Sequence, residues 1–306
     1  MFRLITLLFS FFIICNLLGC QEEKEVKYEV NILDVLGPKG KPIFDTINVP
    51  LKLKIIVKEI SELNTYETGV LGKGQEVSHN FDNYEKLKKV ANDDELLKLT
   101  SNKNLVVSLY AANALAEKNH PQIDKIFNRL ISNNKTVYTQ NGCIVGDENI
   151  SIPFYTKYIY ALEKTKIPKD VNLKKFDSII IFNDHSDDKL INYAFQNRLY
   201  PANYRNRIEF LAFNKNNEGA IFYLSNWHKA VYSNRLQKEI KGLLSQDSLR
   251  PYLYFNYLKE LLDFKNPENN SFILSKLKKD TIWKDYGDNG VEVRWLLDRN
   301  GIYLDL

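Results

Sequence analysis

One short segment of the chain brings together side chains that bind metals. Asp184, His185, Asp187 and Asp188 fall within five consecutive positions. Carboxylate oxygens and imidazole nitrogens are common ligands of divalent metals, so the cluster is a candidate metal site. The same residues also fit the start of a helix, with Ser186 as N-cap and two acidic residues in the first turn. We favour the helix start, which needs no ligand, and predict no metal and no cofactor.

Cys143 is a candidate nucleophile, because it follows Gly142 in what should be a tight turn. No histidine lies near it in the sequence to act as a base. A free cysteine is more often a small buried apolar residue. We therefore assign no catalytic residue. An enzyme with dispersed catalytic residues, centred on Cys143 or on the Asp184–Asp188 cluster, is kept as an alternative.

An aromatic face is the remaining candidate for ligand binding in the body of the chain. Trp227 and His228 lie on an apolar helical stripe, with Phe222 and Tyr223 close by. Such a face could bind a ligand, but we favour ordinary core and inter-helix packing as its explanation. Phosphate-binding loops, serine-hydrolase elbows and zinc-protease motifs are all absent from the sequence.

The N-terminus carries the most specific motif of the chain. A basic start at 1–3 is followed by a mostly apolar run, Leu4 to Leu18. This run is shorter than the roughly 20 residues that span a bilayer and has the size of a signal peptide. Its end, Leu17–Leu18–Gly19–Cys20, resembles the lipobox of bacterial lipoproteins. The resemblance implies cleavage between Gly19 and Cys20 and lipidation of Cys20, and two or more acyl chains anchor a protein stably.

The residues after Cys20 bear on the location of the protein. Gln21 stands where an aspartate would signal retention in the inner membrane of lipoproteins. The acidic cluster at 22–25 is similar to the surface-export tag of some Gram-negative lipoproteins, although a solvated spacer has the same composition. The resemblance implies a cell-envelope, outer-membrane lipoprotein, and the acidic cluster adds the cell surface as a candidate address.

Composition narrows the classes of function. The formal net charge of +4 over 306 residues is too small to predict a nucleic-acid partner. Loss of Cys15 with the signal and lipidation of Cys20 would leave Cys143 without a disulfide partner and exclude a multi-cysteine zinc site. The remaining length suffices for one large domain or two small ones.

Hydrophobic periodicity predicts a mainly α fold. Apolar residues recur at helical spacing in segments on both sides of the chain's midpoint. The segments are 84–91, 96–99, 105–116, 123–130, 190–195, 208–212, 220–231, 236–244 and 253–262.

The stretch 93–131 resembles one HEAT-type helical repeat. The residues that carry the resemblance are 96–99, the alanine-rich segment 106–116 and the stripe 123–130. Ser108 departs from the pattern, since many HEAT repeats have an arginine there. With the Gly-Cys loop at 140–145, the stretch is also similar to a group of uncharacterised bacterial lipoproteins. HEAT repeats stack as helix pairs into solenoids.

Alternation of apolar and polar residues predicts strands in a few places. Short strands are expected at 26–30 and 51–55, followed by a glycine loop at 69–74. Residues 137–152 should form a loop or hairpin. The apolar run 176–182 fits either a strand or a helix, and the segment 291–295 fits a strand or a cap on the helical stack.

Together these patterns predict an α-solenoid, a HEAT-like stack of helix pairs, with a small N-terminal β region. The expected divisions are a signal peptide at 1–19, an anchor spacer with the β region at 20–79 and a helical-repeat body at 80–306. We expect a lipid-anchored, non-catalytic binding or scaffolding module whose partners are the membrane, through its acyl chains, and a protein or peptide. The alternatives are the enzyme described above and a lipoprotein that protects against toxins.

Overall fold

The computed structural model describes residues 41–72, 76–196, 198–246, 249–280, 283 and 289–303. All of them belong to one compact unit, Gly40–Leu306. The predicted signal peptide, Cys20, the acidic cluster and the strand expected at 26–30 lie outside the described residues.

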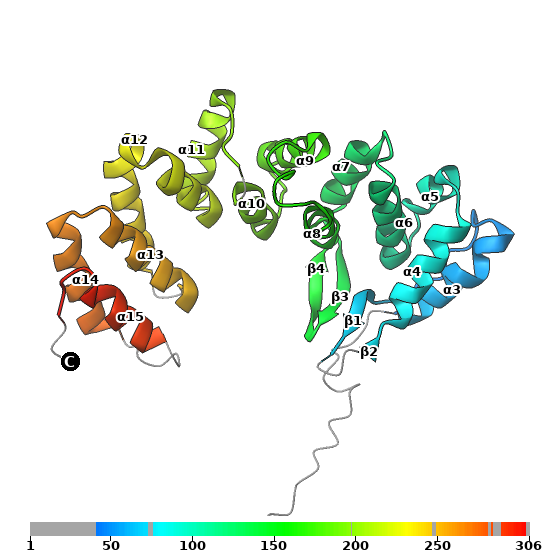
Figure 1. The fold of residues 1–306 in the computed structure, drawn as a ribbon, viewed down its shortest axis with the longest axis horizontal. Coiled ribbons are helices and arrows are strands. Elements are labelled where there is room, and N and C mark those ends of the chain that lie inside the picture. The colour runs from blue at the N-terminus through cyan, green and yellow to red at the C-terminus, as the bar shows by residue number, and fades with distance from the viewer. Residues whose placement is uncertain are drawn as a thin grey trace, which may run out of the picture. The chain divides into compact units, whose positions relative to one another are not determined.

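Helices make up most of the described chain, which confirms the mainly α prediction (Figure 1). Within the described residues no helix is both long enough and apolar enough to span a bilayer. The described α-helices are α3 (Lys54–Leu63), α4 (His79–Val90), α5 (Asp93–Leu99), α6 (Leu105–Glu117), α7 (Ile123–Asn133), α8 (Ser151–Ala161), α9 (Val171–Phe182), α10 (Asp188–Phe195), α11 (Arg205–Phe213), α12 (Glu218–Leu244), α13 (Pro251–Asp263), α14 (Pro267–Lys279) and α15 (Asn289–Asp298), with short 3-10 helices η1 (Leu51–Leu53) and η2 (Ala202–Tyr204).

Asparagine side chains fix where several helices begin. Asn92 and Glu95 form a capping box at α5, in which each side chain accepts the other residue's backbone N–H, at 2.9 and 2.8 Å. Asn217 caps α12 by accepting the N–H of Ala220 at 3.0 Å. These caps satisfy backbone donors that have no partner inside the helix, so the polar residues between apolar stripes set the helix boundaries.

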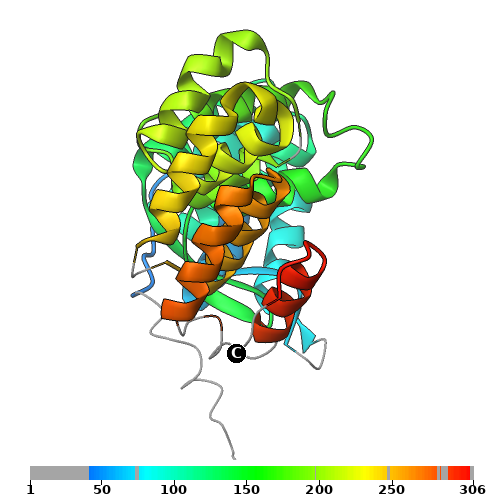
Figure 2. The same cartoon turned by 90° about the vertical axis from the view of Figure 1, so that its left-hand side faces the viewer.

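From α6 onwards, the helices pack chiefly against helices one or two places further along the chain. Helix α6 contacts α7 and α8, α8 contacts α10, and α10 contacts α12. In the same way α7 contacts α9, and α9 contacts α11. One row therefore contains α6, α8 and α10, and the other contains α7, α9 and α11 (Figure 1). Figure 2 views the C-terminal end of this unit, where α14 and α15 both pack on α13.

A small sheet pairs two distant segments of the chain. Its strands are β1 (Tyr66–Leu71), β2 (Glu76–Val77), β3 (Thr136–Gly142) and β4 (Ile144–Asn149), in the order β2-β1-β3-β4. The β1–β3 pair is parallel, and the other two pairs are antiparallel. The β3–β4 hairpin confirms the hairpin alternative at 137–152. Gly142 has a φ of +57° there, which glycine adopts without steric cost.

The strand expected at 51–55 was wrong, because this segment begins a helical element instead. Leu53, Val57 and Ile60 are completely buried at a spacing of four and three residues, which is one face of η1 and α3. The alternating apolar residues Leu51 and Ile55 are exposed. Burial here follows the helical period of 3.6, not the alternation, so helices begin well before residue 80.

Four other expectations are resolved by the structure. The run 176–182 is the second half of α9, with Phe176 and Ile180 buried one turn apart. The segment 291–295 lies within α15 and is not a strand. The glycine loop expected at 69–74 was wrong at its start, since Gly69 lies inside β1. The two stripes at 220–231 and 236–244 form one helix, α12, whose backbone leaves helical geometry at His228.

A buried ion pair joins α8, α9 and the segment after α10. The Arg198 Nε atom lies 2.8 Å from Asp177 Oδ2, and both side chains are almost fully buried. The hydroxyls of Tyr155 and Tyr200 donate to the same carboxylate, at 2.5 and 3.0 Å. Burial raises the pKa of Asp177 to about 6, although Arg198 and the two hydroxyls oppose that shift. This pair therefore links α8 and α9 to the segment that follows α10.

The Arg198→Met variant should lose stability in a pH-dependent way. Without the guanidinium, the pKa of Asp177 should rise further. Burial of the Asp177 carboxyl in the folded protein would then cost little free energy only when the carboxyl is protonated. We expect the free energy of unfolding to fall by about 3–5 kcal/mol at pH 8, because one charge of a buried pair is left alone. At pH 5 the loss should be much smaller. Urea denaturation at both pH values measures this.

The double variant Asp177→Leu/Arg198→Met serves as the control. Because it removes both charges, its stability should show no such dependence on pH. An equal loss for Arg198→Met at pH 5 and pH 8 would contradict the assigned role of the pair.

Candidate functional site

The Asp184–Asp188 segment forms the start of α10, as the helix interpretation predicted, but its N-cap is Asp187 and not Ser186. The Asp187 carboxylate accepts the N–H of Lys189 at 2.8 Å. Ser186 instead donates to the carbonyl of Ile180 at 2.7 Å. Within the described residues, no group of three or more His, Cys, Asp and Glu side chains could hold a metal ion.

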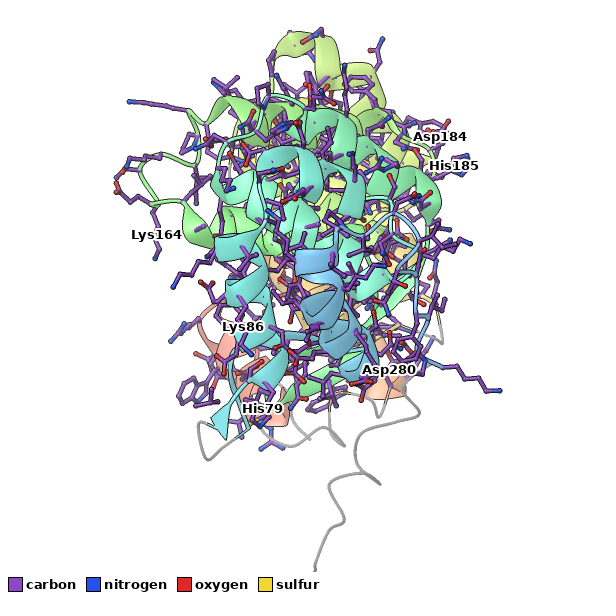
Figure 3. The ribbon with its side chains drawn as sticks, turned by 90° about the vertical axis from the view of Figure 1, so that its right-hand side faces the viewer. His79, Lys86, Lys164, Asp184, His185 and Asp280 are labelled. Carbon is purple, nitrogen blue, oxygen red and sulfur yellow. The ribbon has the colours of Figure 1, made fainter. Side chains whose placement is uncertain are left out.

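The other members of the cluster point to different partners. Asp184 is exposed and pairs with Arg207 at 2.7 Å, and this pairing lowers the pKa of Asp184. Asp188 accepts from the Asn217 amide at 3.2 Å. His185 is exposed beside Asp184 at one edge of the unit, whereas Lys164 lies at the opposite edge (Figure 3). The carboxylates of this segment are therefore engaged in structural contacts.

Cys143 lies between β3 and β4 and is exposed. The expectation that a free cysteine is a buried apolar residue was wrong for this position. The adjacent Ile144 is also largely exposed, at 76%. Cys143 lines none of the pockets described below.

Three neighbouring pockets lie along the row that contains α6, α8 and α10. The α6–α8 pocket has a volume of about 190 Å³, the α8–α10 pocket about 410 Å³ and the α10–α12 pocket about 460 Å³. Leu162 lines the first and the second, and Gln196 lines the second and the third. Because each pocket shares a lining residue with the next, the three are adjacent along this row.

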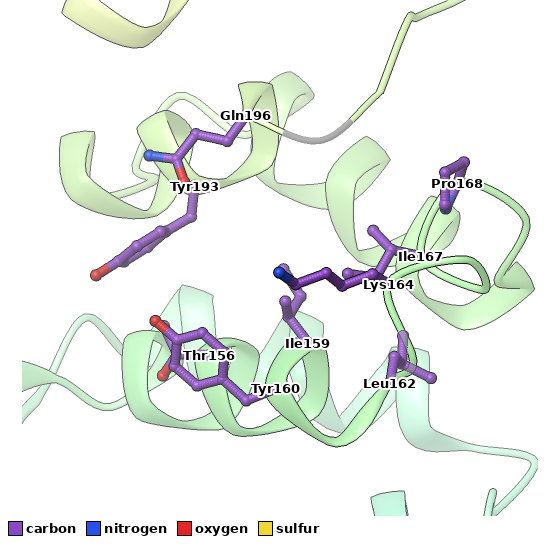
Figure 4. A pocket seen from close by; sticks show the side chains of 9 residues that line it. All are labelled: Thr156, Ile159, Tyr160, Leu162, Lys164, Ile167, Pro168, Tyr193 and Gln196. Atoms are coloured by element: carbon purple, nitrogen blue, oxygen red, sulfur yellow. The ribbon is translucent and has the colours of Figure 1, made fainter.

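The α8–α10 pocket combines an apolar lining with one cation (Figure 4). Among the described residues, Lys164 is the only charged one that lines this pocket, and it reaches from the loop after α8 over Ile159. Its amine has no ion-pair partner in the described part of the chain, unlike Lys166 in the same loop, which pairs with Glu163 at 2.9 Å. The remaining lining residues are Thr156, Tyr160, Leu162, Ile167, Pro168, Tyr193 and Gln196.

The two tyrosines of this pocket keep their hydroxyls available. Neither Tyr160 nor Tyr193 uses its hydroxyl in a hydrogen bond with another described residue. Burial raises the pKa of Tyr193, and the charge of nearby Lys189 partly offsets that rise. A tyrosine hydroxyl carries one hydrogen-bond donor, so each of the two can donate to a ligand.

The α10–α12 pocket is lined by aromatic rings and side-chain amides. Trp227 is 53% exposed and Tyr252 is 48% exposed, so both offer ring surface to a ligand. The amides of Gln196, Asn226 and Asn256 have no hydrogen-bond partner among the described residues. An unpaired amide offers donors and an acceptor together, which matches the alternating groups of a peptide backbone.

Glu218 is the charged lining residue of the α10–α12 pocket, and its charge is balanced. Its carboxylate lies 3.1 Å from Arg250 Nη2 and accepts the Tyr252 hydroxyl at 3.2 Å. It also accepts from the Asn192 amide. The pocket is thus nearly neutral, unlike the α8–α10 pocket beside it.

Close contact between α10 and the start of α12 shapes the α10–α12 pocket. The Asn192 side chain accepts the N–H of Gly219 at 2.9 Å. A Cβ at Gly219 would come within 2.6 Å of Asn192 Oδ1 and 2.7 Å of its Cα, so only glycine permits this approach. Trp227 comes just before the bend of α12 at His228.

The α6–α8 pocket is the smallest of the three, and its charged lining residues Glu117 and Lys157 pair with each other. Glu117 pairs there with Lys88 at 2.8 Å and with Lys157 at 3.1 Å. The Lys157 amine lies 4.0 Å from the centre of the Tyr84 ring. Burial lowers the pKa of Lys157, while Glu117 opposes that shift. Glu117 and Lys157, the charged lining residues of this pocket, are therefore held in one network of ion pairs.

Sequence reasoning found part of this site. The aromatic stripe around Trp227 and Phe222 does line a pocket. The amides of Asn226 and Asn256 gave no signal, because an asparagine on a helix surface looks like any solvated residue. Lys164 lies in a loop and has no sequence pattern that marks it.

No family model, curated protein or solved structure matches the chain in the three comparisons.

Substitution of Gly219 should deform the α10–α12 pocket. Gly219→Ala puts a methyl group against the Asn192 backbone, so α10 and α12 must move apart, at a cost of about 1–3 kcal/mol. Gly242→Ala, in the same helix, meets nothing within 4 Å and should be neutral or stabilising by up to about 1 kcal/mol. Thermal or urea denaturation of the two variants measures the difference. Equal effects would show that the close approach is not required.

Proposed function

We propose that this chain is a lipid-anchored protein of the cell envelope whose helical body binds an extended segment of a protein partner without catalysis. The body would be an α-solenoid of HEAT-like helix pairs. From α6 onwards the helices pack chiefly on helices one or two places along the chain, which supports this architecture because solenoid repeats contact chiefly their neighbours.

The adjacent pockets along α6, α8, α10 and α12 carry the proposal. An extended peptide crosses several helices, and its backbone must be hydrogen-bonded when it leaves water. The unpaired amides of Gln196, Asn226 and Asn256 can supply those bonds. Exposed aromatic rings such as Trp227 add contact area at a low cost in conformational entropy.

The charge arrangement supports binding rather than catalysis. Glu218 is paired with Arg250, and Glu117 is paired with two lysines. The two candidate catalytic groups of the enzyme alternative do not meet in these pockets. The Asp184–Asp188 cluster forms the start of α10, and Cys143 lies outside the pockets. The toxin-protection alternative has no specific contact in its favour.

Support for the anchor comes from the sequence. The ending Leu17–Leu18–Gly19–Cys20 resembles a lipobox, and Gln21 lacks the retention signal for the inner membrane. An outer-membrane location with acyl chains on Cys20 follows from that resemblance. The acidic cluster at 22–25 favours exposure at the cell surface.

Loss of Trp227 should weaken peptide binding. The probe is an array of decapeptides of random sequence, and the best-binding sequences are then synthesised for measurement of dissociation constants. Trp227→Ala should raise these constants about 30-fold, the size of a tryptophan hot spot of about 2 kcal/mol. Trp295→Ala, at a 62% exposed position on α15, is the matched control and should leave them unchanged.

Two results would contradict the binding proposal. One is an array on which no decapeptide binds above background. The other is an equal loss of affinity for the Trp227 and Trp295 variants, which would place the peptide outside the pockets.

Cys20→Ser should abolish acylation and, because the lipoprotein peptidase cuts only after the thiol is lipidated, should also leave residues 1–19 attached. The native chain should be found in the outer-membrane fraction, with an acylated N-terminal peptide detected by mass spectrometry, while the variant should be missing from that fraction and keep its unprocessed N-terminus. On intact cells, a membrane-impermeant maleimide should label the exposed Cys143 of the native chain. Cys143→Ser controls for labelling elsewhere. A native chain that is not acylated would contradict the anchor, and labelling only after lysis would contradict surface exposure.

A further inference from the structure

We propose that the α8–α10 pocket binds the C-terminal carboxylate of a peptide whose last side chain is apolar. This inference rests on the proposed function, since the rest of the peptide would continue into the α10–α12 pocket. The peptide would therefore run from the α10–α12 pocket toward its C-terminus in the α8–α10 pocket.

The positive charge of the α8–α10 pocket indicates that its ligand carries a negative charge. Lys164 is the only charged lining residue, and its amine has no ion-pair partner in the described part of the chain. Figure 4 shows this amine above Ile159, directed toward the middle of the pocket. Lys166 and Glu163, its neighbours in the loop, pair with each other and so leave the charge of Lys164 uncompensated.

The uncharged polar groups of the pocket are donors that suit an oxyanion. The Gln196 amide and the hydroxyls of Tyr160 and Tyr193 have no hydrogen-bond partner among the described residues. A carboxylate accepts several hydrogen bonds at once and donates none. A cation with three neutral donors therefore matches a carboxylate better than a neutral or cationic group.

The rest of the lining requires an apolar group close to that carboxylate. Ile159, Leu162 and Ile167 lie on the side of the pocket from which Lys164 extends, together with Pro168 (Figure 4). A volume of about 410 Å³ accommodates an apolar side chain with the carboxylate beside it. A terminal residue such as leucine carries both groups on one Cα atom, whereas an aspartate or glutamate side chain brings the charge without the apolar group.

The neighbouring pocket distinguishes a peptide from a free carboxylic acid. Gln196 lines both pockets, so a chain that ends beside Lys164 passes it on the way to Asn226 and Asn256. Those amides pair with backbone groups that a short carboxylic acid does not have. The α10–α12 pocket is also nearly neutral, which suits the uncharged backbone.

The test compares two forms of one peptide pool on the purified full chain. Fluorescein-labelled hexapeptides have leucine fixed at the last position and the other positions randomised, and they end either in a carboxylate or in an amide. Fluorescence anisotropy gives the dissociation constants. We expect the carboxylate form to bind about tenfold tighter, the effect of a hydrogen-bonded charge pair. Hexanoic acid is the third probe.

Two variants locate the effect. Lys164→Gln should abolish the difference between the carboxylate and amide forms. Lys166→Gln, which alters the same exposed loop but does not line the pocket, should preserve it. Ile159→Ala should weaken the carboxylate form further, because it removes apolar contact with the last side chain.

The outcomes separate this inference from the proposed function. Equal binding of both peptide forms, with affinity still dependent on Trp227, would overturn the carboxylate assignment and leave the peptide-binding proposal intact. Hexanoic acid that binds tighter than the peptides in a Lys164-dependent way would overturn the assignment of a peptide. Absence of binding by every peptide, on the arrays as well, would overturn both.

Discussion

The buried pair of Asp177 and Arg198 is the interaction on which the arrangement of the pockets depends. Tyr155 from α8, together with Arg198 and Tyr200 from the segment after α10, converges on the Asp177 carboxylate of α9. Gln196, which joins the two larger pockets, comes only two residues before Arg198. A buried charge tolerates little displacement from its partner, so the pair fixes the spacing of these helices more strictly than apolar contacts would.

A second constraint acts where α10 meets α12. Gly219 lets the backbone of α12 approach Asn192, and the Asn192 amide then serves both the Gly219 N–H and the Glu218 carboxylate. Glu218 in turn holds Arg250 and Tyr252, at the start of α13. One close approach thus positions residues from three helices around the aromatic pocket, while the amides nearest to solvent stay unpaired.

The helical segments were predictable because their apolar residues repeat with the period of 3.6 that burial follows. The prediction of a strand at 51–55 failed because three apolar residues happened to alternate there, and only the burial of Leu53 with Val57 and Ile60 showed that the helical period applied. The parallel pairing of β1 with β3 joins residues far apart in the chain, and no local pattern encodes it. The pockets were the least predictable feature. Trp227 could be identified as a candidate from its residue type alone. The proposed roles of Lys164 and Asn256 depend on neighbouring residues of other helices, which the sequence does not show.

Packing between nearby helices has a consequence for how the chain is made. A newly synthesised chain emerges from its N-terminus, and most helices from α6 onwards can pack as soon as the next one or two have appeared. Local contacts of this kind favour rapid folding. The sheet is the exception, since Tyr66 of β1 pairs with Thr139 of β3 and must wait for more than seventy further residues. Strands β1 and β2 should therefore be the last part of the N-terminal segment to complete their hydrogen bonds. Until β3 is synthesised, the unpaired edge of β1 is open to pairing with another chain.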